Sequence, residues 1–180
     1  YKLNFYDNRP GTKNMSKIWN KIIRESTCDY LVIMDSDIFV PKLSPCWLTR
    51  LMDTFEKKSN CLVVSPRITK TSCIQQRGKV AEDREPERFT EAFAGMCTLY
   101  KKEVFEKVGY FDEDFLMYGS DSEWAFRCLK SGAGAYLRPD VVVEHISHYS
   151  TGKEAKAVKT AYDASVEREY ASQLYDEKTK

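Results

Sequence analysis

Two hydrophobic patterns alternate along the first half of the chain. Apolar side chains recur at helical spacing over residues 14–26, where Asn14 suits an N-cap, and a second helical stripe follows a Ser-Pro pair at 44–45, expected to cap that helix and fill its first turn. Unbroken apolar runs at 30–34 and 61–64 predict strands buried on both faces. This alternation predicts an α/β fold in which a mostly parallel sheet is flanked by helices in a single domain.

The second half of the chain predicts shorter elements. A polar, aperiodic stretch over residues 69–88 is typical of a surface loop or flap. Helical spacing at 104–108 and 121–131, each followed by a glycine, predicts two more helices. Two short strands are expected near Tyr136 and at 141–143.

The same patterns suggest domain boundaries. Residues 1–152 form one predicted domain, and residues 153–180, rich in Lys, Glu and Ala, predict a charged C-terminal helix or tail. Residues 1–6 resemble a strand that begins without a lead-in. We therefore expect earlier strands of the sheet to precede this stretch.

Composition and charge narrow the possible functions. The chain has 28 Lys and Arg against 27 Asp and Glu, a net charge of +1 that provides no general field for a nucleic acid. No apolar run approaches the roughly 20 residues of a transmembrane helix. The six cysteines lack C-x-x-C spacing, and Cys61, Cys97 and Cys128 stand in contexts that suit reduced, buried thiols. We expect a cytoplasmic protein, either free or peripheral to a membrane, with no nucleic-acid partner and no transmembrane segment.

The first candidate site is the acid pair Asp35 and Asp37. Acid-x-acid spacing occurs several times in this chain, so the spacing alone decides nothing. Position distinguishes this pair, because it directly follows the strand at 30–34 and ligands of open α/β sheets bind beyond the carboxyl ends of strands. Two carboxylates there suit Mg²⁺ or Mn²⁺ together with substrate phosphates. Helix capping and loop solvation are an equally good explanation.

A second acidic cluster spans residues 109–123 and mixes acids with aromatic side chains. Asp121 and Glu123 fall in the first turn of a predicted helix, where the helix dipole favours acids for structural reasons alone. A calcium-binding EF-hand loop is excluded, because its sixth position would be Met117 instead of glycine.

The only two histidines, His145 and His148, follow a predicted strand. Histidine is a frequent metal ligand, although a lone histidine more often only forms hydrogen bonds. Lys153, shortly after them, could contact phosphate as a point charge, and a polar surface turn explains it equally well.

Taken in order, these segments resemble the family-2 glycosyltransferases of the GT-A fold. Residues 14–20 resemble the family's asparagine-rich helix start, and residues 30–37 resemble its strand that ends in the D-x-D metal motif. Residues 93–96 resemble the segment that lines the sugar and acceptor pocket, and residues 108–127 resemble the stretch that carries the catalytic base. The resemblance runs from about residue 6 to residue 153 and implies that the family's first strands lie upstream.

The resemblance also implies roles for individual residues. Asp35, Asp37 and His145 would hold Mn²⁺ or Mg²⁺ against a nucleotide-diphosphate sugar, with a UDP-sugar as the commonest case. Asp121 would be the general base that deprotonates a glycan or other hydroxyl acceptor, giving inversion at the anomeric carbon. The remaining implied contacts are donor binding by Asn14, Lys17, Asp35, Ser36, Asp37 and Lys153, and an acceptor or sugar pocket at Gly95, Met96, Asp112, Glu113 and Trp124.

Two alternative functions compete with this one. A haloacid-dehalogenase-like phosphatase also has an apolar strand ending in D-x-D, with the first aspartate as nucleophile. It leaves the pattern at residues 109–127 unexplained, and Phe39 stands where a small residue is usual. A catalytically inactive, transferase-like carbohydrate-binding module is the second alternative, because a fold alone does not prove activity.

Overall fold

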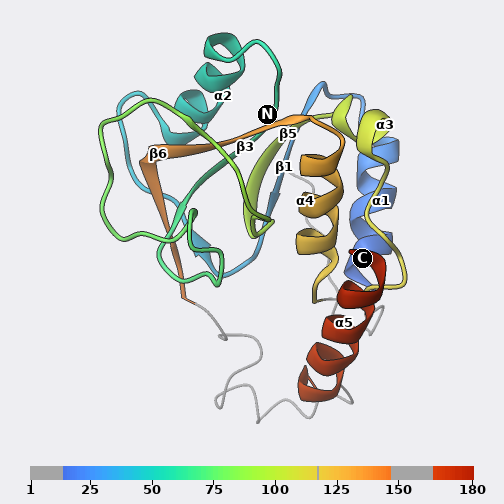
Figure 1. Cartoon of the computed structure of the whole chain (residues 1–180). Coiled ribbons are helices and arrows are strands. Elements are labelled where there is room, and N and C mark those ends of the chain that lie inside the picture. The colour runs from blue at the N-terminus through green and yellow to red at the C-terminus, as the bar shows by residue number, and fades with distance from the viewer. Residues whose placement is uncertain (1–13, 117, 147–163) are drawn as a thin grey trace.

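The structure is a computed structural model in which residues 14–116, 118–146 and 164–180 are described. Within these ranges a sheet is combined with helices that pack on both of its faces (Figure 1). The helices are α1 (Met15–Glu25), α2 (Trp47–Lys57), α3 (Val104–Val108), α4 (Ser120–Lys130) and α5 (Ala164–Lys178). The strands are β1 (Tyr30–Met34), β2 (Ile38–Phe39), β3 (Cys61–Ile68), β4 (Glu87–Arg88), β5 (Cys97–Lys101) and β6 (Gly134–His145).

The helix starts show how local side chains set the boundaries. Asn14 caps α1 as predicted, its side-chain oxygen accepting the Lys17 N–H at 2.8 Å. The predicted cap of α2 was wrong: the helix begins at Trp47, and its N-cap is Cys46, whose sulfur accepts the Thr49 N–H at 3.5 Å. The cap is the residue whose side chain reaches the third N–H of the helix, and that residue is not Ser44.

The sheet has six strands in the order β1-β5-β3-β6-β2, with β4 also paired to β6. The expectation of a mostly parallel sheet was wrong for the described strands, because only β3 and β6 pair in parallel and the other four pairings are antiparallel. A continuous apolar run carries no information about the direction of a strand relative to its neighbours. β5, which lies between β1 and β3, is antiparallel to both.

Three strands nevertheless share one direction. β5 is antiparallel to both β1 and β3, and β3 is parallel to β6, so β1, β3 and β6 all end at the same edge of the sheet. The segment that leads into β5 starts at this edge. The edge therefore gathers residues that are far apart in the sequence.

Two strands differ from their predicted form. The two short strands expected around Tyr136 and residues 141–143 are one strand, β6, with a register shift opposite Pro66 and Arg67. β1 is not buried on both faces, because its alternate side chains are more than a third exposed, and its described pairing is with β5 alone. These exposed side chains are Tyr30, Val32 and Met34.

The core lies on both sides of the sheet. One side is covered by α1, α3 and α4 (Figure 1). The core on that side is an aromatic cluster in which Trp124 meets Tyr100 edge to face at 5.4 Å between ring centroids. On the other side α2 packs Leu51 and Phe55 against β3. All six cysteines are free thiols, and the three predicted to be buried are buried.

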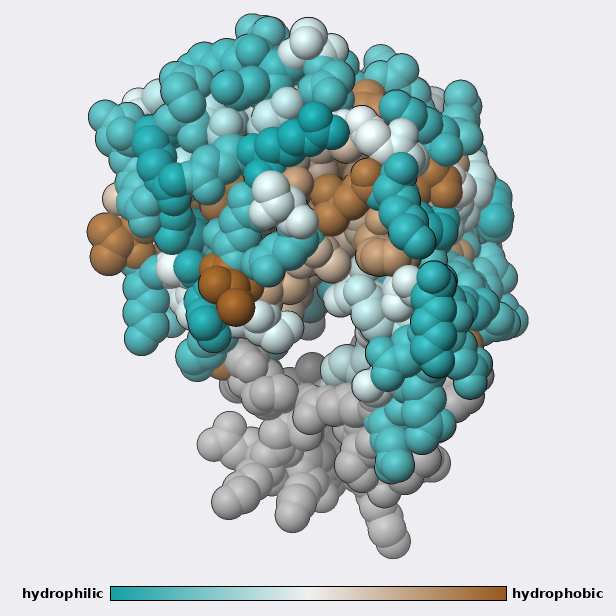
Figure 2. Space-filling view, in the orientation of Figure 1, coloured by the Kyte–Doolittle hydropathy of each residue, from teal (hydrophilic) through white to brown (hydrophobic). Residues whose placement is uncertain are grey.

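The described surface is mainly hydrophilic on the face in Figure 2, where hydrophobic side chains are scattered and the outer side of α5 is polar. Among the described helices, none combines the length and the apolar character needed to cross a bilayer.

Candidate active site

The candidate site lies where β1, β3 and β6 end. Asp35 and Asp37 follow β1, and β2, which comes directly after them, pairs with the last two residues of β6. Ile38 therefore lies opposite His145. The Ile146 N–H also bonds the Asp37 carbonyl at 3.1 Å, so the end of β6 is fixed to the acid-x-acid turn.

Three predicted metal ligands meet at this point. One oxygen of Asp35, one of Asp37 and one ring nitrogen of His145 all lie within 4.8 Å of one another. Nε2 of His145 is 3.5 Å from Oδ2 of Asp37, and the two side chains are only 12% and 14% exposed. The fold thus brings two carboxylates together with an imidazole that is far from them in the sequence.

Hydrogen bonds define the chemistry of His145. Its Nδ1 lies 2.8 Å from the Lys70 carbonyl oxygen, which can only accept, so Nδ1 carries the hydrogen. In the neutral ring the lone pair is then on Nε2, which faces Asp37. The His145 N–H also bonds the Thr69 hydroxyl at 3.1 Å. The Lys70 carbonyl, which accepts the Nδ1 hydrogen, orients the ring in the way that metal-bound histidines are usually oriented.

The electrostatics of the cluster fit a cation. Burial raises the pKa of Asp35 to about 7, with further contributions from the negative charges of Asp121 and Asp37, while His145 lowers it. Within the described ranges no Lys or Arg forms an ion pair with either carboxylate of the acid-x-acid turn. Two carboxylate oxygens and one imidazole nitrogen are a donor set that suits Mn²⁺ or Mg²⁺.

Asp121, the predicted base, is held firmly in the first turn of α4. Its Oδ2 accepts the Gly95 N–H at 2.8 Å, and its Oδ1 accepts the Ser122 N–H at 2.9 Å. A Cβ on Gly95 would lie 2.9 Å from the Cβ of Asp121, so only glycine allows this close approach. The segment that supports Asp121 also supports the metal cluster, because the next carbonyl, that of Met96, accepts the Asp35 N–H at 2.8 Å.

The buried side chain of Gln76, which the sequence did not single out, supports the backbone just before Gly95. Gln76 is fully buried; its Nε2 donates to the Ser65 hydroxyl at 2.5 Å and to the Ala94 carbonyl at 3.1 Å, and its Oε1 accepts the Ala94 N–H at 2.9 Å. The stretch at 69–88 is largely irregular, as predicted, yet this residue anchors it in the core. A glutamine in a polar loop gives no sequence signal of burial.

Asn14 and Lys17, two of the residues predicted to bind the donor, lie at the start of α1, where the Asn14 side chain has structural partners. Its Nδ2 donates to the Glu113 carbonyl at 2.7 Å, and its oxygen caps the helix, so both polar groups are used within the fold. Lys17 is exposed on the same helix, and Ser36 is exposed between the two cluster aspartates. Lys153 lies outside the described residues.

The predicted acceptor pocket needs correction. Gly95 and Met96 contact the site through their backbones, but Trp124 is fully buried and donates its indole N–H to the Gly109 carbonyl at 2.8 Å. A side chain in the aromatic core cannot line an open pocket. Glu113 faces α1, where its carboxylate accepts from Asn20 at 2.9 Å.

Two acids near the base also have structural partners. Asp112 pairs with Lys178 of α5. Glu123, only 2% exposed, holds Arg127 through two hydrogen bonds of 2.5 and 2.8 Å, and the guanidinium in turn bonds the carbonyls of Val108 and Tyr110. Of the acids in this segment, Asp121 alone is joined to the Gly95–Met96 segment by a hydrogen bond in the described structure.

Comparisons with known proteins agree with this architecture. No family model matches the chain. Over 76 residues the chain is 32% identical to a dTDP-rhamnosyl transferase, RfbF, of Shigella flexneri, a match that covers 42% of this chain and 25% of that protein. The fold of the present chain is similar to that of GalNAc-T7, which was solved with UDP, GalNAc and Mn²⁺. The TM-score is 0.54 and the sequence identity 16%, and the match covers 74% of this chain and 30% of GalNAc-T7. The chain thus has a GT-A glycosyltransferase fold and spans about a quarter to a third of the length of these proteins.

Proposed function

We propose that this chain carries the metal site and the catalytic base of an inverting glycosyltransferase, which moves a sugar from a nucleotide-diphosphate sugar to an acceptor hydroxyl. The proposal rests above all on one observation: the Asp35–Asp37–His145 cluster and Asp121 are supported by adjacent residues of one backbone segment. The GT-A fold agrees with it. A metal ligand set and a positioned base are the two parts that such a transfer needs.

Asp35, Asp37 and His145 would hold the divalent cation. When bound, Mn²⁺ or Mg²⁺ neutralises charge on the two phosphates and on the departing nucleoside diphosphate. RfbF is named as a dTDP-rhamnosyl transferase, and GalNAc-T7 was solved with UDP. Both nucleotides contain a pyrimidine base, so the nucleotide of the donor to test first is a pyrimidine nucleoside diphosphate.

Asp121 would accept the proton of the acceptor hydroxyl as its oxygen attacks the anomeric carbon from the face opposite the phosphate, which inverts the configuration. The N–H groups of Gly95 and Ser122 fix the carboxylate, so the base does not have to reorient during the reaction. Positioning of this kind is what separates a catalytic acid from one that merely begins a helix.

The phosphatase alternative is less well supported. It assigns no role to residues 109–127, whereas the structure brings Asp121 of that segment close enough to raise the pKa of Asp35. An inactive carbohydrate-binding module would share the fold and is separated from the transferase by experiment.

The decisive experiment is calorimetric titration of dTDP, UDP, GDP and ADP into the chain with Mn²⁺ and with EDTA. We expect one of the pyrimidine nucleotides to bind only with metal. Asp37→Ala should abolish this binding while its circular dichroism stays unchanged, because the substitution removes a metal ligand from a turn and takes no apolar side chain out of the core.

Asp83→Ala is the matched control, since Asp83 belongs to another acid-x-acid pair but is exposed. It should bind nucleotide as the unmodified protein does. Metal-independent binding, or equal binding by the Asp37→Ala variant, would contradict the proposed metal site. Release of phosphate from simple esters would favour the phosphatase.

A further inference from the structure

The C-terminal helix α5 packs beside the proposed base. Ala171 is 4% exposed, and its Cβ would lie 3.5 Å from a Cβ placed on Gly119, the residue that precedes α4. At the end of the helix Lys178 pairs with Asp112 and, at 2.7 Å, with Asp114. These two carboxylates raise the pKa of the Lys178 ammonium group, so α5 is tied to the domain by a charged as well as an apolar contact.

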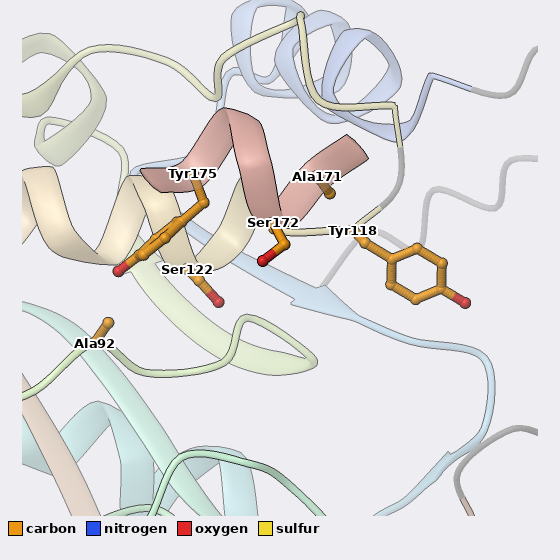
Figure 3. A pocket seen from close by; sticks show the side chains of 7 residues that line it. Ala92, Tyr118, Ser122, Ala171, Ser172 and Tyr175 are labelled. Carbon is orange, nitrogen blue, oxygen red and sulfur yellow. The ribbon is translucent and has the colours of Figure 1, made fainter. Parts of the chain in front are cut away.

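A groove with a volume of about 350 Å³ lies between α5 and the start of α4. This volume falls in the range of small-molecule sites and is sufficient for a single sugar ring. Figure 3 shows the hydroxyls of Ser122 and Ser172 directed into the same space, with the Tyr175 ring beside them. The labelled lining residues are Ala92, Tyr118, Ser122, Ala171, Ser172 and Tyr175.

The chemistry of this lining suits a neutral sugar. Among the described residues that line the groove, none has a charged side chain, and two tyrosine rings and two serine hydroxyls supply most of its functional groups. A sugar ring has hydroxyls that need hydrogen-bond partners and C–H faces that pack on aromatic rings, and tyrosine offers both a ring and a polar tip.

The groove also has the right location. Ser122 follows the proposed base directly, and its N–H bonds the Asp121 carboxylate at 2.9 Å. Ala92, on the opposite wall, belongs to the segment that continues into Gly95, the other hydrogen-bond donor to that carboxylate. Ser122, the residue after the proposed base, lines the groove, so a sugar held there would lie next to the turn of α4 that carries Asp121.

We propose that this groove is the acceptor subsite, that it binds a neutral sugar residue of the acceptor, and that Tyr175 of α5 is the main determinant of acceptor binding. The inference rests on the proposed transferase function and adds the substrate class and the position of the acceptor. It replaces Trp124 with Tyr175 as the aromatic residue of the acceptor pocket.

Binding can be tested without knowing the natural acceptor. The probes are neutral methyl hexosides, methyl 6-deoxyhexosides and methyl N-acetylhexosaminides, titrated by saturation-transfer NMR into the whole chain with Mg²⁺ and the nucleotide that binds best. We expect Tyr175→Ala to raise the Kd of the best glycoside at least tenfold. The Kd of Tyr175→Phe, which keeps the ring, should stay within about threefold of that of the unmodified chain.

Two further variants separate a direct contact from a general effect on the helix. Gln173→Ala changes an exposed residue of the same helix and should bind as the unmodified chain does. Ser172→Phe should fill the groove and abolish glycoside binding while nucleotide binding is kept. All variants are compared by circular dichroism.

The inference is overturned if Tyr175→Ala and Ser172→Phe bind the glycoside normally, or if no glycoside binds to a chain that binds nucleotide and metal. The latter result leaves the proposed function standing. Failure of nucleotide binding in the unmodified chain would instead count against the transferase, and glycoside binding could then still identify a carbohydrate-binding module.

Discussion

Two acidic pairs in this protein have opposite electrostatic surroundings. Asp35 and Asp37 converge with the Nε2 atom of His145, and in the described structure no Lys or Arg pairs with them. Asp53 of α2 and Asp140 of β6 are both bonded to Arg138, at 3.0 and 2.5 Å. The first pair is arranged to receive a cation, and the second already has one.

The pKa values follow this difference. Burial and neighbouring carboxylates raise the pKa of Asp35 to about 7. Hydrogen bonds from Lys57 and then Arg138 lower the pKa of Asp53. Burial opposes a low pKa at Asp140, but the hydrogen bonds and positive charges of Arg138 and Arg50 together outweigh it, and the pKa falls. A functional and a structural carboxylate are thus distinguished by the partners that the fold supplies, and acid spacing in the sequence does not separate them.

The largest expected effect is on catalysis. Asp121→Asn removes the group that accepts the proton and should lower turnover of the nucleotide sugar by roughly 10²–10⁴-fold, while metal-dependent nucleotide binding is retained. Asp140→Asn is the control from the structural pair and should keep its turnover at a temperature where it is folded. Equal losses of turnover in both variants would show that Asp121 is a structural acid like Asp140.

The next effect concerns stability. Asp140 is 15% exposed and bonds Arg50 at 3.0 Å as well as Arg138, so Asp140→Asn should destabilise the fold by about 2 kcal/mol at pH 7, as measured by urea unfolding. The folded pKa is lowered, so this contribution is present above the unfolded pKa, near 4, and is lost as the pH falls through the folded value. The difference between the two proteins should therefore shrink below about pH 4, and a difference that persists there would contradict the role of the charge.

The smallest effect should have the opposite sign. In metal-free protein at pH 8, Asp35→Asn removes one of several crowded negative charges and should stabilise the fold, on the order of 1 kcal/mol in the same unfolding measurement. Added Mn²⁺ should stabilise the unmodified chain and have less effect on the variant. A loss of stability like that of Asp140→Asn would show that Asp35 is tied into the fold as a structural acid.

Much of the site was accessible from local sequence patterns. The apolar run ending in Asp35 and Asp37, and the glycine and acids around Asp121, stood out because periodicity and turn chemistry act over a few residues. The convergence of the two acids with His145 was implied only by the family resemblance, and the fold brings it about by ending β1 and β6 at the same edge of the sheet.

Other features gave no such signal. Trp124 was assigned to a pocket by the family resemblance, whereas the structure places the side chain in the aromatic core. Gln76 looked like one more polar loop residue until its contacts with Ser65 and Ala94 were known. Tyr175 lay in a segment predicted only as a charged helix or tail.

The sequence by itself determined the helices of the domain, three of its six described strands (β1, β3 and β6), and the placement of the acid-x-acid turn directly after a strand, because backbone propensity, capping and apolar spacing are local properties. Only the tertiary structure decided the antiparallel course of β5, the backbone bond between Gly95 and Asp121, the orientation of His145 by a carbonyl 75 residues away, and the packing of α5 beside the proposed base. These are contacts between distant segments, and their geometry depends on how the whole sheet and its covering helices pack together.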